Sequence, residues 1–190
     1  MIRMFVLLIG LAGCGGSSVS SGGGAVMVDF DTLQDAVSST GITPFAAIPD
    51  SGTHRYDGQM ALNLPLGTTP HATYLGRFDL RLSFADASVA SAGTVKAFTA
   101  VNENTLGGEL VFSGGTLVPN ADPNRDFVMF ADLGGKLTNG ATTYDLDAQV
   151  AADIYGLTAD GVAGQVFSGV IRQGDDIDIF DGSFAGKKVP

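Results

Sequence analysis

The chain has 190 residues, a formal charge of −10, a single cysteine and no tryptophan. This acidic balance argues against electrostatic docking onto nucleic acid or anionic lipid, and one cysteine excludes a disulfide within the chain. The length is that of one ordinary domain, which can bury a core without disulfides.

Residues 1–13 have the pattern of a secretory signal peptide. Arg3 supplies a positive start, and the apolar run 4–11 is too short to span a bilayer as a helix. The sequence LAGC at 11–14 then resembles the lipobox of bacterial lipoproteins. That resemblance implies that Cys14 becomes the first mature residue and carries a diacylglyceryl group, so that the chain is anchored to a membrane. An ordinary signal peptide with a chance cysteine, or a buried free thiol, is the alternative.

The segment 14–28 is predicted to be the acylated cysteine and a flexible tether, because the run GGSSVSSGGG cannot support a packed element. Residues 29–54 are predicted as a lead-in to the folded domain. It would contain a short helix over 31–41 that ends at Gly41, followed by an irregular piece interrupted by prolines and glycine. The apolar residues of that helix would lie near one side, and they are Phe30, Leu33 and Val37.

From residue 55 onward, apolar and polar residues alternate, which predicts half-buried β-strands. In YLGRFDLRLSF at 74–84, every second residue from Phe78 to Phe84 is apolar, and 56–64 and 143–150 alternate in the same way. Five less regular runs complete the set, near 92–100, 108–118, 127–137, 163–172 and 177–185. No helical run is long enough to connect parallel strands, so the sheet is predicted to be antiparallel.

The fold class that follows is all-β, with a single antiparallel eight-stranded β-barrel over 55–190 and a flexible N-terminal tether. Eight strands can close into a barrel whose interior is just filled by side chains. Glycines that precede an apolar residue by two positions, such as Gly58 and Gly164, suit closely packed, strongly bent strands. A β-sandwich is the alternative. A transmembrane barrel is disfavoured because tryptophan is absent and tyrosine is scarce, so that no aromatic girdles form.

The stretch DIYGLTADGVAGQV at 153–166 resembles the signature hairpin of the transferrin-binding protein B barrel domains. Tyr155-Gly156, Ala159-Asp160 and Gly164 match that pattern, and FDGSFAG at 180–186 resembles the closing strand of the family. The resemblance covers about residues 50–190 and extends to the barrel of factor H-binding protein. It implies a surface lipoprotein of the outer membrane that binds a macromolecule through its loops, in iron acquisition or by capture of a host or partner protein.

Four loops are the candidate contact regions, near 66–73, 102–107, 119–126 and 156–162. The candidate contact residues within them are Asn102, Glu103, Asn120, Arg125 and Thr158. Gly15, in place of an aspartate after Cys14, favours the outer membrane by the lipoprotein sorting convention. The expected partners are therefore the membrane, through the lipid on Cys14, and a protein ligand at the loops, without nucleic acid.

We predict no enzymatic activity, no cofactor and no metal site. His54 and His71 are expected to be exposed to solvent, and no metal-binding motif includes them. Ser51, His54 and Asp57 lie too close together on one extended segment to build a catalytic triad. The acidic run Asp175–Asp181 lacks the glutamate of a calcium loop and is interpreted as turn carboxylates. Two rival functions remain, a carrier of a small apolar ligand and a structural envelope lipoprotein without a specific ligand.

Overall fold

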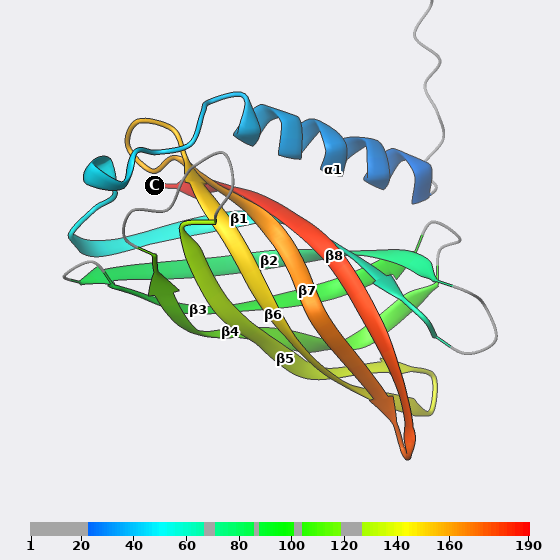
Figure 1. Ribbon diagram of the computed structural model, residues 1–190. Helices are drawn as coiled ribbons and strands as arrows, with labels where there is room; N and C mark the ends of the chain where they lie inside the picture. Colours follow the sequence, from blue (N-terminus) through cyan, green and yellow to red (C-terminus); the bar gives the residue numbers. More distant parts are fainter. Residues whose placement is uncertain (1–22, 67–70, 86–87, 101–103, 119–126) are drawn as a thin grey trace, which may run out of the picture.

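The computed structural model describes residues 23–66, 71–85, 88–100, 104–118 and 127–190. The signal peptide, Cys14 and the tether up to residue 22 therefore lie outside the described residues. Eight consecutive strands pair antiparallel, and the last closes the sheet onto the first (Figure 1). They are β1 (Ser51–Leu64), β2 (Ala72–Ala85), β3 (Ser88–Ala100), β4 (Thr105–Leu117), β5 (Met129–Asn139), β6 (Thr142–Tyr155), β7 (Gly161–Gln173) and β8 (Asp176–Val189). The predicted barrel is confirmed, and its closure excludes the β-sandwich.

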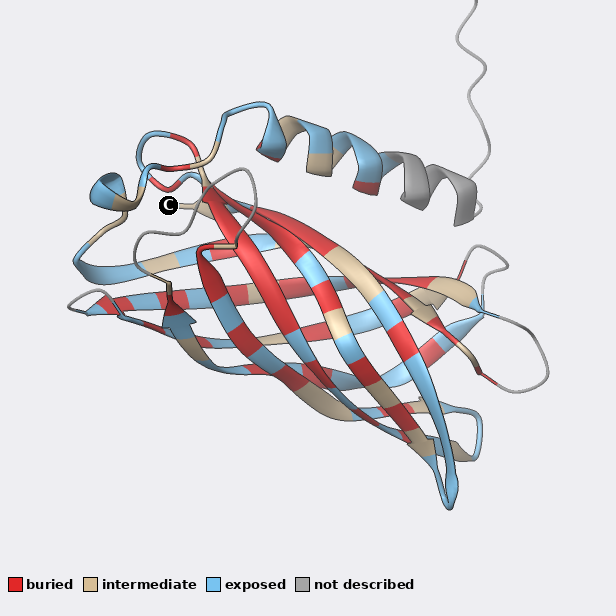
Figure 2. Cartoon of the chain, in the orientation of Figure 1, coloured by how far each residue is buried: buried red, intermediate tan, exposed pale blue. Residues whose placement is uncertain are grey.

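The alternation in the sequence corresponds to the inside and the outside of the barrel. On β2, Phe78, Leu80, Leu82 and Phe84 are at most 4% exposed, whereas Arg77 and Arg81 face solvent. Figure 2 shows the same alternation as bands of buried and exposed residues along the strands. The row from Phe78 to Phe84 thus points inward, as predicted.

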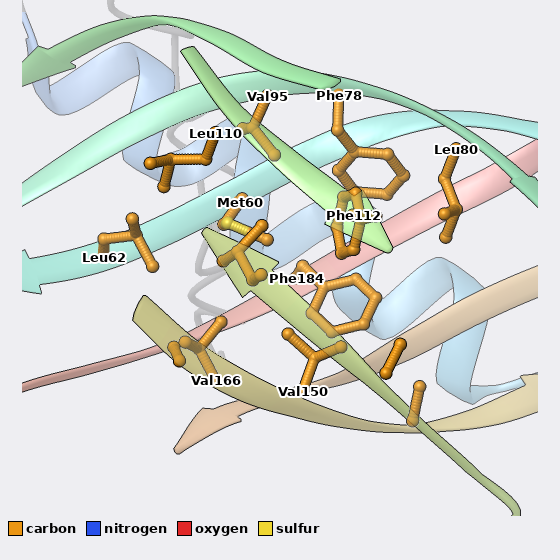
Figure 3. Packing of buried hydrophobic residues seen from close by; sticks show 14 of the residues in the cluster. Met60, Leu62, Phe78, Leu80, Val95, Leu110, Phe112, Val150, Val166 and Phe184 are labelled. Atoms are coloured by element: carbon orange, nitrogen blue, oxygen red, sulfur yellow. The ribbon is translucent and has the colours of Figure 1, made fainter. Parts of the chain in front are cut away.

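Aromatic rings fill the middle of the barrel. Phe78, Phe112 and Phe184 come from three different strands, and their ring centroids lie 5.8–5.9 Å apart (Figure 3). These edge-on and tilted contacts are the arrangements that aromatic rings prefer. The inward side chains of all eight strands join this one cluster, as expected for a barrel whose interior is only wide enough for side chains.

Strand β1 begins at Ser51, four residues before the predicted start of the barrel at 55. Residues 51–54 show no clear apolar alternation, but their backbone pairs with the end of β2, with Ser51 opposite Ala85. The cross-strand partner thus decides where this strand begins. Ahead of it, the piece from Gly41 to Asp50 is irregular apart from an isolated bridge between Ile42 and Tyr155 and one 3-10 turn, Phe45–Ala47, which agrees with the prediction.

One helix, α1 (Gly23–Ser38), lies along the outside of the barrel against β8, β7 and β1 (Figure 1). It starts eight residues before the predicted start at 31 and includes residues assigned to the tether. The predicted packing face is correct, because Phe30 and Val37 are at most 3% exposed and Leu33 packs beside Val37. Glycine is a poor helix former, so local propensity does not predict the first turn.

Small residues on the outer wall make room for α1. Phe30 packs on Ala61 of β1 and Leu75 of β2, and Val37 packs on Ala163 of β7 and Ala185 of β8. These alanines replace the polar residues that otherwise alternate outward. The helix can therefore approach the sheet closely and seal this stretch of wall from water.

The rest of the outer wall exposes some apolar side chains, among them Ile177 and Ile179, but it also carries many polar and charged ones, and several of these form ion pairs between neighbouring strands. Lys96 meets Glu109 at 2.8 Å, Arg172 meets Asp147 at 2.6 Å, and Lys136 meets Asp145. Such exposed pairs contribute little stability each, but they mark a surface in contact with water. In the described part of the chain, no helix has the length and apolar character needed to cross a membrane.

Candidate functional site

The up-and-down topology assigns the predicted contact loops to opposite ends of the barrel. The connections near 66–73 and 102–107 leave the end where β1 finishes, whereas those near 119–126 and 156–162 leave the end where β1 begins. The strand order therefore assigns two of the loops to each end of the barrel. Among the candidate contact residues, only Thr158 belongs to the described residues, and Asn102, Glu103, Asn120 and Arg125 lie outside them.

The end where β1 begins is closed by the chain itself, and we call it the sealed end. It consists of residues 41–50 together with the β6–β7 turn, residues 156–160, and it lies beside the C-terminus (Figure 1). Ala159 of the turn is fully buried and joins the core, with Phe45 and Ile48 packed against the same cluster. The turn thus covers the open end of the barrel and contributes Ala159 to its core.

Hydrogen bonds from the lead-in hold the first half of the turn. The Gly156 amide donates to the Gly41 carbonyl at 2.9 Å, and the Thr43 hydroxyl donates to the Gly156 carbonyl at 2.5 Å. Gly156 has φ +84°, which glycine adopts without strain. Residues more than a hundred positions apart in the chain thereby fix this part of the turn.

Hydrogen bonds from the barrel hold the second half. The Tyr56 hydroxyl donates to the Ala159 carbonyl at 2.9 Å, and the Lys188 amide donates to the Asp160 carbonyl at 2.7 Å. Burial and the Asp160 carboxylate raise the pKa of Tyr56 well above its ordinary value, so the hydroxyl remains a donor at all physiological pH values. The Thr158 hydroxyl donates to Asp160 Oδ1 at 2.6 Å.

The turn presents one large apolar side chain to solvent. Leu157 is 84% exposed, the highest value of any large hydrophobic residue in the described part of the chain. It stands next to the exposed Thr158 on a backbone held at both ends. An apolar side chain on a pre-organised turn can bind a partner without a large loss of conformational entropy.

His54 is half-buried at the sealed end, so the prediction that it is exposed is wrong. Its Nδ1 lies 3.3 Å from the Tyr56 hydroxyl, its Nε2 lies 3.5 Å from Lys188 Nζ, and its ring meets the edge of Phe84. Burial and the Lys188 ammonium lower the pKa of His54. The histidine occupies the next inward position before Tyr56, so extending the alternation by one step would have predicted its burial.

The remaining candidate groups are placed as follows. His71 is exposed. Asp57 points out of the barrel and meets Arg55 at 3.3 Å, whereas His54 points inward, so these two residues and Ser51 do not converge. In the acidic run, Asp181 accepts a hydrogen bond from Asn63 at 2.6 Å and Asp178 accepts one from the Ile179 amide. No group of three or more His, Cys, Asp or Glu residues suited to a metal ion occurs among the residues with described positions.

Asp153 is a buried carboxylate that the sequence analysis did not identify. It lies two residues before the end of β6, is 7% exposed, and accepts a hydrogen bond from the Val128 amide at 3.2 Å. Burial raises the pKa of its carboxyl group, and the amide donor counteracts the rise only in part. The sequence signal is the interruption of alternation in AAD at 151–153, where an outward position becomes buried.

We expect Asp153→Asn to stabilise the protein at neutral pH. Because the folded state holds this proton more tightly than the unfolded state, the stability of the native protein falls as pH rises from the ordinary value of 3.8 through the raised pKa. Asparagine keeps an oxygen acceptor for Val128 and removes the charge. Urea denaturation should show a higher midpoint for the variant at pH 7, with the difference shrinking as pH approaches 3.8.

The matched control is Asp132→Asn, which removes a charge from an exposed position on neighbouring strand β5. Its midpoint should change little. A lower midpoint for Asp153→Asn at pH 7 would show that the ionised carboxylate makes a favourable contact, contrary to this prediction.

No protein-family model matches the chain, and no curated protein does so.

Proposed function

We propose that this chain is a lipid-anchored lipoprotein of the outer membrane that binds a partner protein at the sealed end of its barrel. The observation that carries the proposal is the exposure of Leu157 on a turn fixed by hydrogen bonds from Tyr56, Thr43 and Lys188. The buried core of a protein interface is more apolar than the rest of a protein surface. A rigid element also loses little conformational entropy on binding. Thr158 and Asp160 supply polar groups around Leu157.

The position of α1 supports an orientation of the barrel in which the sealed end points away from the membrane. Phe30 contacts the barrel near the end of β1, and Val37 contacts it near the start of β7, at the sealed end. The chain therefore enters the helix beside the opposite end. With a lipid on Cys14, the opposite end would lie toward the membrane and the sealed end would face outward.

The proposed partner class follows from the resemblance to transferrin-binding protein B barrels, which implies iron acquisition or capture of a host or partner protein. The resemblance rests in part on Tyr155, Gly156 and Gly164. Tyr155 and Gly156 lie where β6 meets the turn, and Gly164 lies in the adjacent strand β7. The rival role as a carrier of a small apolar ligand is disfavoured, because aromatic rings occupy the middle of the barrel (Figure 3).

Photocrosslinking in the native host tests the proposal. A photoreactive phenylalanine analogue at position 157 should produce a covalent adduct with one protein, whereas the same analogue at Gln149, exposed on the wall of β6, should not. Protease added to intact cells should digest the barrel. Labelled palmitate should enter the native protein and not the Cys14→Ser variant.

Each part of the proposal has its own contrary result. Equal adducts at positions 157 and 149, or none at either, would favour a structural lipoprotein of the envelope. Digestion only after cell lysis would refute surface display. Palmitate incorporation into Cys14→Ser would refute the anchor.

A further inference from the structure

A groove of about 590 Å³ lies between α1 and the outer wall of β1, β2 and β3, and Leu157 and Thr158 are not among its lining residues. Leu33 of the helix forms one side, and Gly58 and Phe78 contribute an apolar part of the lining. Its other lining residues are polar or charged, and they are Arg55, Asp57, Gln59, Arg77, Asp79, Thr94 and Lys96.

Two cations stand side by side in this groove. Arg77 of β2 and Lys96 of β3 are directly opposite in the strand register and point to the same outer face. Lys96 has a partner in Glu109, at 2.8 Å, whereas Arg77 forms no ion pair with any residue that the structure describes. Like charges directly opposite each other destabilise a sheet. An anion between them would remove this repulsion.

The carboxylates of the groove do not compensate Arg77. Arg55 donates from Nε to Asp79 at 2.7 Å and lies 3.3 Å from Asp57, so it neutralises much of their charge. Arg81 also approaches Asp79, at 3.8 Å. The positive charge of Arg77 therefore remains available in a protein whose net charge is −10.

A buried acceptor without a donor lies beside Arg77. Gln59 of β1 is opposite Arg77 in the register, and its Oε1 atom is buried without a hydrogen-bond partner in the structure. A buried polar atom without a partner destabilises the fold. Gln59 lies in the same register row as Arg77 and Lys96. On the other neighbouring strand of Arg77, β3, the register of the pairing with β2 shifts next to Lys96. The residue after Lys96 is Ala97, which has φ +57°. Bulges of this kind redirect side chains and occur often beside binding sites.

We propose that this groove binds a small sugar acid. The carboxylate of the ligand lies between Arg77 and Lys96. The exposed oxygens of Asp57 and Asp79 accept hydrogen bonds from hydroxyl groups of the ligand, and Leu33 covers the apolar face of the ring. The site is independent of the partner binding proposed for the sealed end.

Thermal unfolding and NMR titration of the full chain test this site with D-glucuronate as the probe. D-glucose, which lacks the carboxylate, is the neutral control, and sodium chloride keeps the ionic strength constant. Glucuronate should raise the melting temperature and shift the amide signals of 58–60, 76–79 and 95–97 in a saturable way. Glucose should do neither.

Arg77→Gln should change two properties in opposite directions. The melting temperature without ligand should rise by about 1–2 °C, because the repulsion of Lys96 is lost. The affinity for glucuronate should fall at least about tenfold. The matched control is Arg81→Gln, on the same face of the same strand but outside the groove lining, which should leave glucuronate binding unchanged.

Three results would overturn the proposal. The first is the absence of saturable shifts with glucuronate, and the second is equal shifts with inorganic phosphate, which would show a general attraction of anions. The third is equal loss of binding in Arg77→Gln and Arg81→Gln. A fall in melting temperature for ligand-free Arg77→Gln would assign Arg77 a structural role instead.

Discussion

Replacing Phe184 by alanine should lower the free energy of unfolding by about 3–5 kcal/mol. Phe184 is fully buried, and its ring centroid lies 5.9 Å from that of Phe78 and 5.8 Å from that of Phe112. The surrounding strands belong to a closed hydrogen-bonded ladder, so they cannot move inward to fill the cavity that the substitution leaves. Urea denaturation followed by circular dichroism measures the difference.

Phe167→Ala is the matched control for this substitution. Phe167 is half-buried on the outer wall of β7 and meets the edge of Phe130 at a centroid distance of 6.3 Å. Its loss should lower the free energy of unfolding by about 1 kcal/mol. Equal effects of the two substitutions would contradict the conclusion that the aromatic rings inside the barrel dominate its stability.

Gly164→Ala should destabilise the barrel by about 3 kcal/mol. A methyl group at this position would lie 2.1 Å from the Ala151 carbonyl oxygen and 2.7 Å from the Ala152 Cα atom. Both atoms belong to the backbone of β6, so the clash can be relieved only by separating β6 from β7. Chemical denaturation of the purified variant measures the loss.

Gly134→Ala provides the comparison, because it adds the same methyl group to neighbouring strand β5 in ordinary space. The nearest atoms to that methyl would be Asp147 Oδ1 and the Leu146 carbonyl oxygen, both at 3.4 Å. We expect a change within about 1 kcal/mol. Similar large losses for both variants would show that the effect comes from backbone flexibility, not from the close approach at Gly164.

Most of the barrel could be predicted because the pattern that defines each strand lies within a short stretch of sequence. Inward and outward residues alternate along each strand, and a slip by one residue would expose the entire row from Phe78 to Phe84. The number of strands and their antiparallel order follow from the turns between them. The bounds were less predictable, because the cross-strand partner rather than the local sequence determines where β1 begins.

The sealed end could not be predicted in the same way. Thr43 and Gly156 are 113 positions apart, and no local pattern indicates that the lead-in binds the turn. His54 was expected to be exposed because it precedes the predicted start of the barrel at 55, whereas β1 begins at Ser51 and brings His54 beside the Phe84 ring. The groove residues Gln59, Arg77 and Lys96 each look like ordinary outward polar residues, and only the strand register places them in a row.

The final strand has a practical consequence for work with this protein. β8 ends at Val189, and the Lys188 amide is hydrogen-bonded to the turn that carries Leu157, so the end of β8 borders the proposed partner-binding face. An affinity tag fused after Pro190 would shield that face and give a false negative in interaction assays. The β5–β6 hairpin turn at Gly140, at the other end of the molecule, is the better insertion point for an epitope.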